Sequence, residues 1–341
     1  MACAEGTVKS GPLYLSRLPG EGMQRPIEPC TNFWTCNDIK LGNGEYDAPA
    51  TDDDTVRKNE IKVTVRNGGT EPVTNVTLQV WVCDYNVGIG PAGGIDSAGG
   101  AGGLGDRYLT VLEKGQSKEF TLFWYATYAD RVRNPGGHHC IIANVKGDAP
   151  ETGTLIDTAA TQDVIFICCD SHHGWRNIAA KPISKKLMAE GDDRFDLGFL
   201  LGNPTRNDLE GTLTVTEVPM GFGAVERDHL LNLGWVEWTD PRLDPVCTRL
   251  VLAGEGGFPP GKSVVVAGTD RRMADLGMEG GIGAGREIPF RIGPDDQIPM
   301  RVTGVFDRDA EPGEVFVFDV VQQDTKGNVL SGARMLAAVG R

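Results

Sequence analysis

The chain has 341 residues, a formal net charge of −14 and an apolar fraction of 40%. This acidic charge argues against binding to nucleic acid or to an anionic membrane surface, and no run of lysine and arginine offsets it. No apolar stretch reaches the roughly 20 residues that a membrane-spanning helix needs. The length suits two domains of roughly 150 residues each. The 46 glycines and 20 prolines favour short strands joined by many turns.

Residues 1–32 contain four prolines and little periodicity, which predicts an extended N-terminal arm. The first residues lack the basic region and apolar core of a secretory signal peptide. We therefore expect synthesis in the cytoplasm without a cleaved signal peptide, with incorporation into a particle as one destination.

Residues 33–41 predict a first strand, and residues 59–83 predict the two central strands of the first domain. Ile61, Val63 and Val65 alternate with polar residues, as on a half-buried strand. The segment 67–72 gathers turn-forming residues. The stretch 76–82 then repeats apolar residues with period two. This pattern is typical of an antiparallel β-sandwich.

The glycine-rich stretch 86–106 contains Gly88-Ile-Gly-Pro-Ala-Gly93, which matches the dinucleotide-binding pattern by letter. That motif needs a helix to begin at the third glycine, whereas more glycine follows here. A long surface loop is the better interpretation. Gly256 to Ser263 likewise imitates a phosphate-binding loop, but Pro259 and Pro260 remove amides that a phosphate would need.

Further strands are predicted at 108–125, with a turn at 114–116, at 139–145 and at 163–169. Several features follow one another along the chain: Trp34, the Asn59–Thr70 strand and turn, the Gly115-Gln-Ser turn before Trp124, His139-Cys140-Ile-Ile-Ala143 and Trp175-Arg-Asn177-Ile178. In this order they resemble the CARDB-type bacterial immunoglobulin-like domain. The resemblance covers about residues 33–182. It implies an immunoglobulin-like sandwich of the kind used for adhesion, spacing and assembly. The loop at 86–106 and the segment 168–173 depart from the family pattern.

Residues 183–194 are polar and charged and predict a linker. After it, alternating residues at 195–201 lead into an Asn-centred turn at 202–205 and a further strand near 213, which repeats the pattern of the first domain. Later strands are expected at 261–267, 286–292, 300–306, 314–321 and 329–335, with a hairpin loop at 325–328. We therefore expect an all-β chain of two tandem immunoglobulin-like β-sandwiches, at 33–182 and 195–341, behind the arm at 1–32. The second domain is only generically immunoglobulin-like.

Four of the five histidines form two pairs: His138-His139 directly precedes Cys140, and His172-His173 follows Cys168-Cys169 after two further residues. If their strands are antiparallel neighbours, both pairs could meet at one rim of the first sandwich, where imidazole and thiolate would suit Zn²⁺. Adjacent side chains on a strand point to opposite faces, however, so at most one of each pair can face a shared site. Packing and hydrogen bonding at the rim are the alternative role. The weak metal candidates are His138, His139, Cys140, His172 and His173; we expect no bound metal, no cofactor and no catalytic residue.

The eight cysteines are scattered along the chain and include the vicinal pair Cys168-Cys169. In a cytoplasmic chain of this size they predict reduced thiols, with Cys83, Cys140 and Cys168 in or beside the first core. In an oxidising space, Cys30–Cys36 or Cys83–Cys140 become candidate bridges.

The sequence lacks the usual nucleophile and metalloprotease motifs. It therefore favours a non-enzymatic structural or interaction module, such as a subunit or adaptor of a large bacterial or phage-like assembly. We expect protein partners, contacted through the arm at 1–32 and the loop at 86–106, and an oligomer or larger assembly. The alternatives are a hydrolase with a zinc site at the rim, and an exported adhesion or carbohydrate-binding protein.

Overall fold

The computed structural model describes residues 9–18, 20–26, 33–41, 56–83, 106–133, 139–148, 168–184, 194–203, 207–217, 247–254, 264–268, 286–294, 297–306 and 315–340. Nearly all the elements in these ranges are strands, and the helix α2, Tyr128–Arg133, has six residues. The predicted all-β architecture of immunoglobulin-like β-sandwiches is therefore confirmed. No helix in the described part of the chain is long and apolar enough to cross a membrane.

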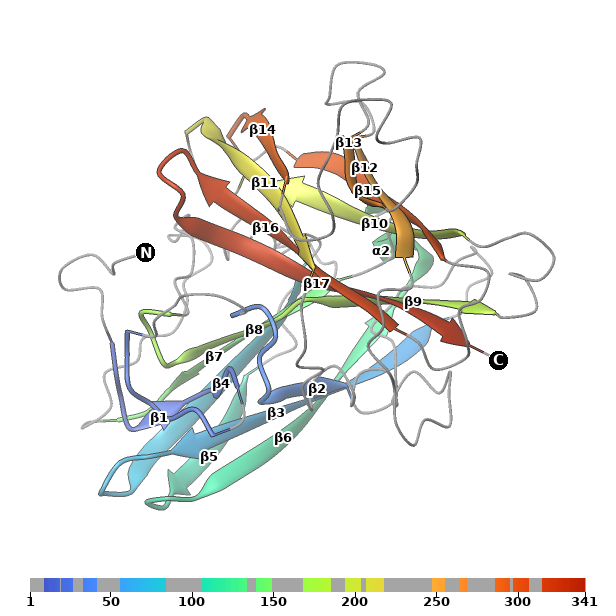
Figure 1. Cartoon of the computed structure of the whole chain (residues 1–341). Coiled ribbons are helices and arrows are strands. Elements are labelled where there is room, and N and C mark those ends of the chain that lie inside the picture. The colour runs from blue at the N-terminus through green and yellow to red at the C-terminus, as the bar shows by residue number, and fades with distance from the viewer. Residues whose placement is uncertain are drawn as a thin grey trace.

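The first sandwich consists of two sheets, coloured blue through teal to light green in Figure 1. In one sheet β3, Arg57–Asn67, pairs antiparallel with β1, Leu13–Tyr14, with β2, Ile39–Leu41, and with β6, Ser117–Ala126. The other has the order β5-β4-β7-β8, formed by Arg107–Leu112, Val73–Cys83, Cys140–Lys146 and His173–Arg176.

The core of this sandwich follows the alternation in the sequence. Ile61, Val63 and Val65 on β3 are fully buried, while the residues between them lie half exposed on the outer face. On β6, Leu122 and Trp124 are buried in the same way. The predicted central strands are thus confirmed, because burial of one face stabilises the register that the alternation defines. The strand expected at 33–41 is shorter: only 39–41 are in β2, and 33–38 contain turns and an isolated bridge.

The second sandwich lies above the first in Figure 1 and is coloured green to red. One sheet has the order β14-β11-β16-β17-β9, formed by Arg286–Ile292, Leu209–Glu217, Val315–Asp324, Val329–Gly340 and Ile178–Ser184. The other has the order β10-β15-β12-β13, formed by Arg194–Gly202, Gln297–Phe306, Cys247–Gly254 and Val264–Gly268. Phe195 and Phe318, with ring centroids 6.4 Å apart, join the two sheets.

Two asparagines close equivalent turns in the two sandwiches. The Asn67 amide donates to the carbonyls of Glu71 and Leu112, both at 2.9 Å. The Asn203 amide donates to the carbonyls of Asn207, at 2.7 Å, and Ile292, at 3.0 Å. Each side-chain amide binds one carbonyl four residues later and one carbonyl from a distant segment. These two hydrogen bonds explain why asparagine occurs at the same place in both turns.

Strand β9 departs from the predicted organisation. Residues 178–182 were expected to end the first sandwich and 183–184 to begin the linker, but 178–184 pair with β17 as the parallel neighbours Arg334↔Ile178 through Gly340↔Ser184. The pairing places this segment on an edge of the second sandwich, directly after β8 of the first. The linker residues 185–193 lie outside the described ranges.

Candidate functional site

The first histidine pair belongs to the core of the first sandwich. His139 is fully buried, and its ring meets Trp124 edge-on with centroids 4.7 Å apart. Cys140 is a buried free thiol that pairs in register with the equally buried Cys83. His138 lies outside the described residues. The two described side chains of this group serve packing.

The second pair surrounds a carboxylate. Residues 168–172 contain turns and an isolated bridge, and residues 163–167 of the strand predicted at 163–169 lie outside the described residues. The Asp170 carboxylate lies 2.5 Å from Nδ1 of the fully buried His172 and 3.3 Å from Nε2 of His173. The His172 amide donates to the same carboxylate at 3.0 Å. Burial alone would raise the pKa of Asp170, but the hydrogen bonds from both histidines outweigh burial and hold the pKa well below its usual range.

Among the described histidines, His139 does not lie at the same rim as His172 and His173. His173 opens β8 and pairs with Asn144, near the end of β7, whereas His139 precedes the start of β7. About five residues of strand, or roughly 17 Å, separate the two positions. The condition for convergence is not met, because His172 and His173 lie at the start of β8, the strand that pairs with β7, instead of after its end. Among the described residues, no three His, Cys, Asp or Glu side chains gather as metal ligands.

The cysteines correct a second expectation. Cys168 and Cys169 are disulfide-bonded, so the prediction of reduced thiols is wrong for this pair. It is right for the buried Cys36, Cys83 and Cys140, which are free. A disulfide forms only where the fold brings two sulfur atoms together, and the spacing of cysteines in the sequence does not show where this happens. The sequence therefore could not separate the bonded cysteines from the free ones. Burial, with a contribution from the Asp38 carboxylate, raises the pKa of the Cys36 thiol to about 12.

The described residues of the N-terminal arm lie on the first sandwich. Residues 9–18 and 20–26, called the strap below, pass over the turn at 168–172. The Lys9 amide donates to the Cys169 carbonyl at 2.8 Å, and the Ser171 amide donates back to Lys9 at 3.0 Å. The Leu15 amide reaches the Ser171 carbonyl at 2.9 Å, and Leu13 and Leu15 are buried in the core. The strap therefore completes the first sandwich.

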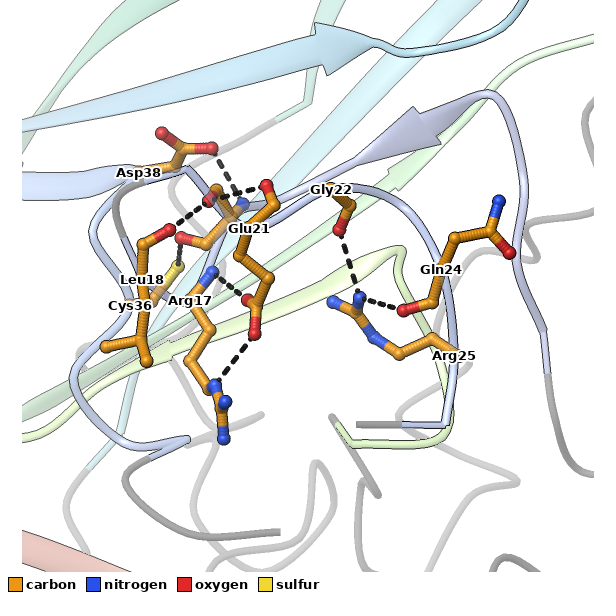
Figure 2. Close-up of polar contacts among 9 residues, drawn as sticks. Arg17, Leu18, Glu21, Gly22, Gln24, Arg25, Cys36 and Asp38 are labelled. Atoms are coloured by element: carbon orange, nitrogen blue, oxygen red, sulfur yellow. Dashed lines mark hydrogen bonds and ion pairs between the residues drawn. The ribbon is translucent and has the colours of Figure 1, made fainter. Parts of the chain in front are cut away.

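Charged side chains fold the second half of the strap (Figure 2). The Arg17 guanidinium lies 3.0 Å from the Glu21 carboxylate, which also accepts the Arg17 amide at 2.8 Å. Ser16 Oγ donates to the Leu18 carbonyl at 2.7 Å. Burial lowers the pKa of the Arg25 guanidinium, and the Glu21 and Asp170 carboxylates oppose that shift. The Arg25 guanidinium therefore interacts electrostatically with one carboxylate of the strap, Glu21, and with one of the sandwich body, Asp170.

Asp38 attaches this folded part of the strap to the first sheet. Its carboxylate accepts the Ser16 amide at 2.7 Å and binds both nitrogens of the Arg66 guanidinium fork at 2.7 and 2.8 Å. Cys36 Sγ lies 3.3 Å from the Ser16 carbonyl, and Figure 2 shows Cys36 and Asp38 beside this part of the strap. Asp38 is 1% exposed, so the charge-assisted contacts compensate for its burial.

A second group of contacts joins the two sandwiches. Trp34 is 1% exposed and packs against Gly332 of β17. Its indole N–H donates to Asp319 at 3.4 Å, and Asp319 forms a two-point ion pair with Arg334, both contacts at 2.8 Å. The Asn177 amide side chain donates to the Gly332 carbonyl at 2.9 Å. These residues, called the joint below, bury polar and aromatic groups together.

The outer face of the β3–β6 pair presents aromatic side chains to solvent. Phe123 and Tyr125 are 36% and 59% exposed, and they pair in register with Glu60 and Lys58. The Lys58 ammonium lies 3.9 Å from the centre of the Phe123 ring. Tyr108 on β5 is 72% exposed. The alternation in the sequence predicts that these side chains point outward. It does not show that they form an aromatic surface different from other exposed residues.

A scan with models of protein families finds none that matches this chain, and a comparison with curated proteins finds no match. Solved structures show remote likenesses. A CARDB domain of a Pyrococcus furiosus protein, in complex with di-metal ions, is 14% identical, covers 41% of this chain and 84% of its own, and has a TM-score of 0.22. The collagen adhesin of S. aureus is 8% identical, covering 89% and 92%, with a TM-score of 0.20.

The adhesive subunit of the CFA/I fimbria of enterotoxigenic Escherichia coli is also 8% identical, covering 97% of this chain and 94% of its own, with a TM-score of 0.21. All three likenesses are too remote to carry any conclusion about function.

Proposed function

We propose that this protein is a non-enzymatic structural and interaction module that serves as a subunit or adaptor of a larger bacterial or phage-like assembly. The observation that carries the proposal is the exposed aromatic face of β6, where Phe123 and Tyr125 stand beside Lys58. Aromatic side chains with an apolar body and a polar neighbour are enriched in the centres of protein interfaces. Folding leaves these rings partly exposed, and a protein partner would bury them.

The charge of this face supports a protein partner with an acidic surface. The chain as a whole is strongly acidic, yet Lys40, Lys58 and Lys62 lie on the outer face of the β2-β3-β6 arrangement, with Glu60 bound to Lys62 at 3.3 Å. A locally basic face on an acidic chain favours one docking orientation over others. The arm at 1–32 and the loop at 86–106 remain part of the proposal as further contacts.

Substitution of the two rings tests the proposal. Phe123→Ser/Tyr125→Ser should reduce co-purification of native partners by about 30-fold or more, the effect of losing a hot spot of about 2 kcal/mol. The melting temperature should change little, because both rings are already partly exposed. Thr121→Ser, on the same face of the same strand, is the matched control. Full recovery of partners by the double variant would contradict the proposal.

The disulfide-bonded Cys168 and Cys169 favour a second candidate, an exported adhesion or carbohydrate-binding protein. Disulfides persist in oxidising compartments and are rare in the reducing cytoplasm. A thiol titration of denatured protein, purified from its native source without reductant, separates the two. Fewer than eight thiols would support export or assembly outside the cytoplasm, whereas eight would support a particle that stays in the cytoplasm.

A further inference from the structure

The body of the first sandwich is shaped to accept the strap. At four glycines beneath the strap, an added Cβ would lie close to a strap residue. The contact would be 2.8 Å to Pro12 from Gly69 and 3.0 Å to the Tyr14 ring from Gly68. From Gly147 and Gly174 it would be 3.1 Å to Leu13 and Leu15, with Val73 and Cys36 of the sandwich body nearer still. These four glycines and Ser171 line what we call the strap groove. Larger side chains at Gly68 and Gly69 would therefore press on Tyr14 and Pro12 of the strap.

Backbone hydrogen bonds hold the strap in this groove. Leu13 and Tyr14 pair antiparallel with Asn67 and Arg66 of β3, and the Gly68 amide donates to the Pro12 carbonyl at 2.8 Å. The Gly11 amide donates to Ser171 Oγ at 3.3 Å. Such bonds recognise an extended backbone, and the buried Leu13 and Leu15 side chains add selectivity for an apolar residue at every second position.

The strap joins the remainder of the chain through the six residues between Pro26 and Phe33. Seven Cα–Cα steps span at most about 25 Å when extended. This reach limits how far Phe33 can lie from the groove that the strap of the same chain enters. An identical segment inserted from a neighbour would make the same hydrogen bonds and the same apolar contacts, so exchange loses none of the native contacts.

We propose that the strap groove is a binding site for the strap of a second copy of this chain, and that copies associate by exchanging straps. The inference rests on the proposed function, because it names a partner and a contact for the arm. In the structure the strap occupies its own groove. Exchange is favoured when copies are concentrated, as in an assembly, since the local concentration of neighbouring straps then competes with the strap on the same chain.

Two full-length variants with complementary defects test the proposal. Leu13→Asp/Leu15→Asp disables the strap and leaves the groove intact. Gly68→Val/Gly69→Val obstructs the groove and leaves the strap intact. Each variant is refolded in a redox buffer, and the two are mixed in equal amounts. Sedimentation and native mass spectrometry should show a 1:1 complex at twice the chain mass of 36.6 kDa, while each variant alone stays monomeric.

A chain with both defects, mixed with the groove-defective variant, is the matched control and should give no complex. If a variant fails to fold, a labelled peptide of residues 9–26 provides a second measurement on wild-type protein: its capture during refolding should fall at least tenfold when the peptide carries the two aspartates. A mixture that stays monomeric, or equal capture of both peptides, would overturn the inference. If partner recovery still depends on Phe123 and Tyr125 in that case, strap exchange fails and the proposed function stands.

Discussion

At the scale of single residues, the most constrained group in the first sandwich is the Asp170 carboxylate. It is buried among two histidine rings and a backbone amide that all face it. A buried carboxylate with these partners is stabilised in its charged form, although burial by itself would disfavour that charge. Asp170 is also adjacent to the disulfide-bonded Cys169 and the Lys9 bridge. Its charge therefore stabilises the turn on which the strap rests.

The lowered pKa of Asp170 predicts a pH dependence of stability. An unfolded aspartate titrates near about 3.9, so the contribution of Asp170 to the free energy of unfolding is complete above that pH. The contribution decreases as the pH falls toward the lowered pKa of the folded state. The difference in unfolding free energy between wild type and Asp170→Asn should therefore be largest above about pH 5 and should diminish toward pH 2. Urea titrations across this range measure it; a difference that grows on acidification would contradict the assignment.

Cys36 allows a prediction about reactivity. Because its thiol is buried and its pKa is raised to about 12, almost no thiolate is present at pH 8. Iodoacetamide should modify Cys36 at least 100-fold more slowly in the folded protein than in urea, as followed by peptide mass spectrometry. A free thiol of the unfolded chain is the internal reference. Rapid modification of folded protein would show that the strap above Cys36 opens readily.

At the scale of elements, the strap behaves as part of the core. Leu15 is 1% exposed, and Leu15→Ala should lower the free energy of unfolding by about 2–5 kcal/mol, the usual effect of such a cavity. Leu18, 37% exposed in the same segment, is the matched control, and Leu18→Ala should change stability by less than about 0.5 kcal/mol. Urea denaturation compares the two. Equal effects would mean that the strap does not contribute to folding.

The elements also show how far the sequence predicts this fold. The central strands β3 and β4 and the hairpin turns at Gly115 and Gly327 were predicted, because alternation and positive φ are local properties. The strap was predicted as an extended arm, but its groove was not. From the sequence alone, a glycine that packs under Leu15 cannot be distinguished from a glycine in a loop. The difference depends on contacts between segments that are distant in the sequence.

The candidate site was less predictable than the fold. The sequence identified His139, His172 and His173 as unusual, but their partners Trp124 and Asp170 follow from register and turn geometry. Residues 163–167 of the predicted strand lie outside the described residues, and the structure instead places His173 at the start of β8, opposite Asn144 near the end of β7. Whether the histidines precede or follow the strand that pairs with β7 decides which side chains can meet, and this order follows from the register rather than from local sequence.

At the scale of the whole molecule, the joint connects the sandwiches more firmly than a flexible linker would. Trp34 lies in the aromatic cluster with Phe33 and Trp175, and its backbone carbonyl accepts the Asn177 amide at 2.7 Å. Strand β9 then continues from Asn177 into the second sandwich. The Arg334 amide donates to Asn177 at 3.0 Å, so both sandwiches share this residue. A module of this construction would hold binding faces at a fixed spacing.

Gly332 provides the test of this rigidity. An added Cβ at Gly332 would lie 2.5 Å from the Trp34 ring, and Trp34 is enclosed on its other sides by buried neighbours. Gly332→Ala should therefore displace the ring at a cost of about 1–3 kcal/mol and weaken the coupling between the sandwiches. Wild type should unfold in one transition, and the variant in two, as followed by calorimetry and by tryptophan fluorescence. Gly22→Ala is the control, since a Cβ at Gly22 meets nothing within 4 Å. If Gly332→Ala unfolds in one transition at the wild-type midpoint, the joint does not couple the two sandwiches, and the fixed spacing must come from the parallel pairing of β9 and β17 alone.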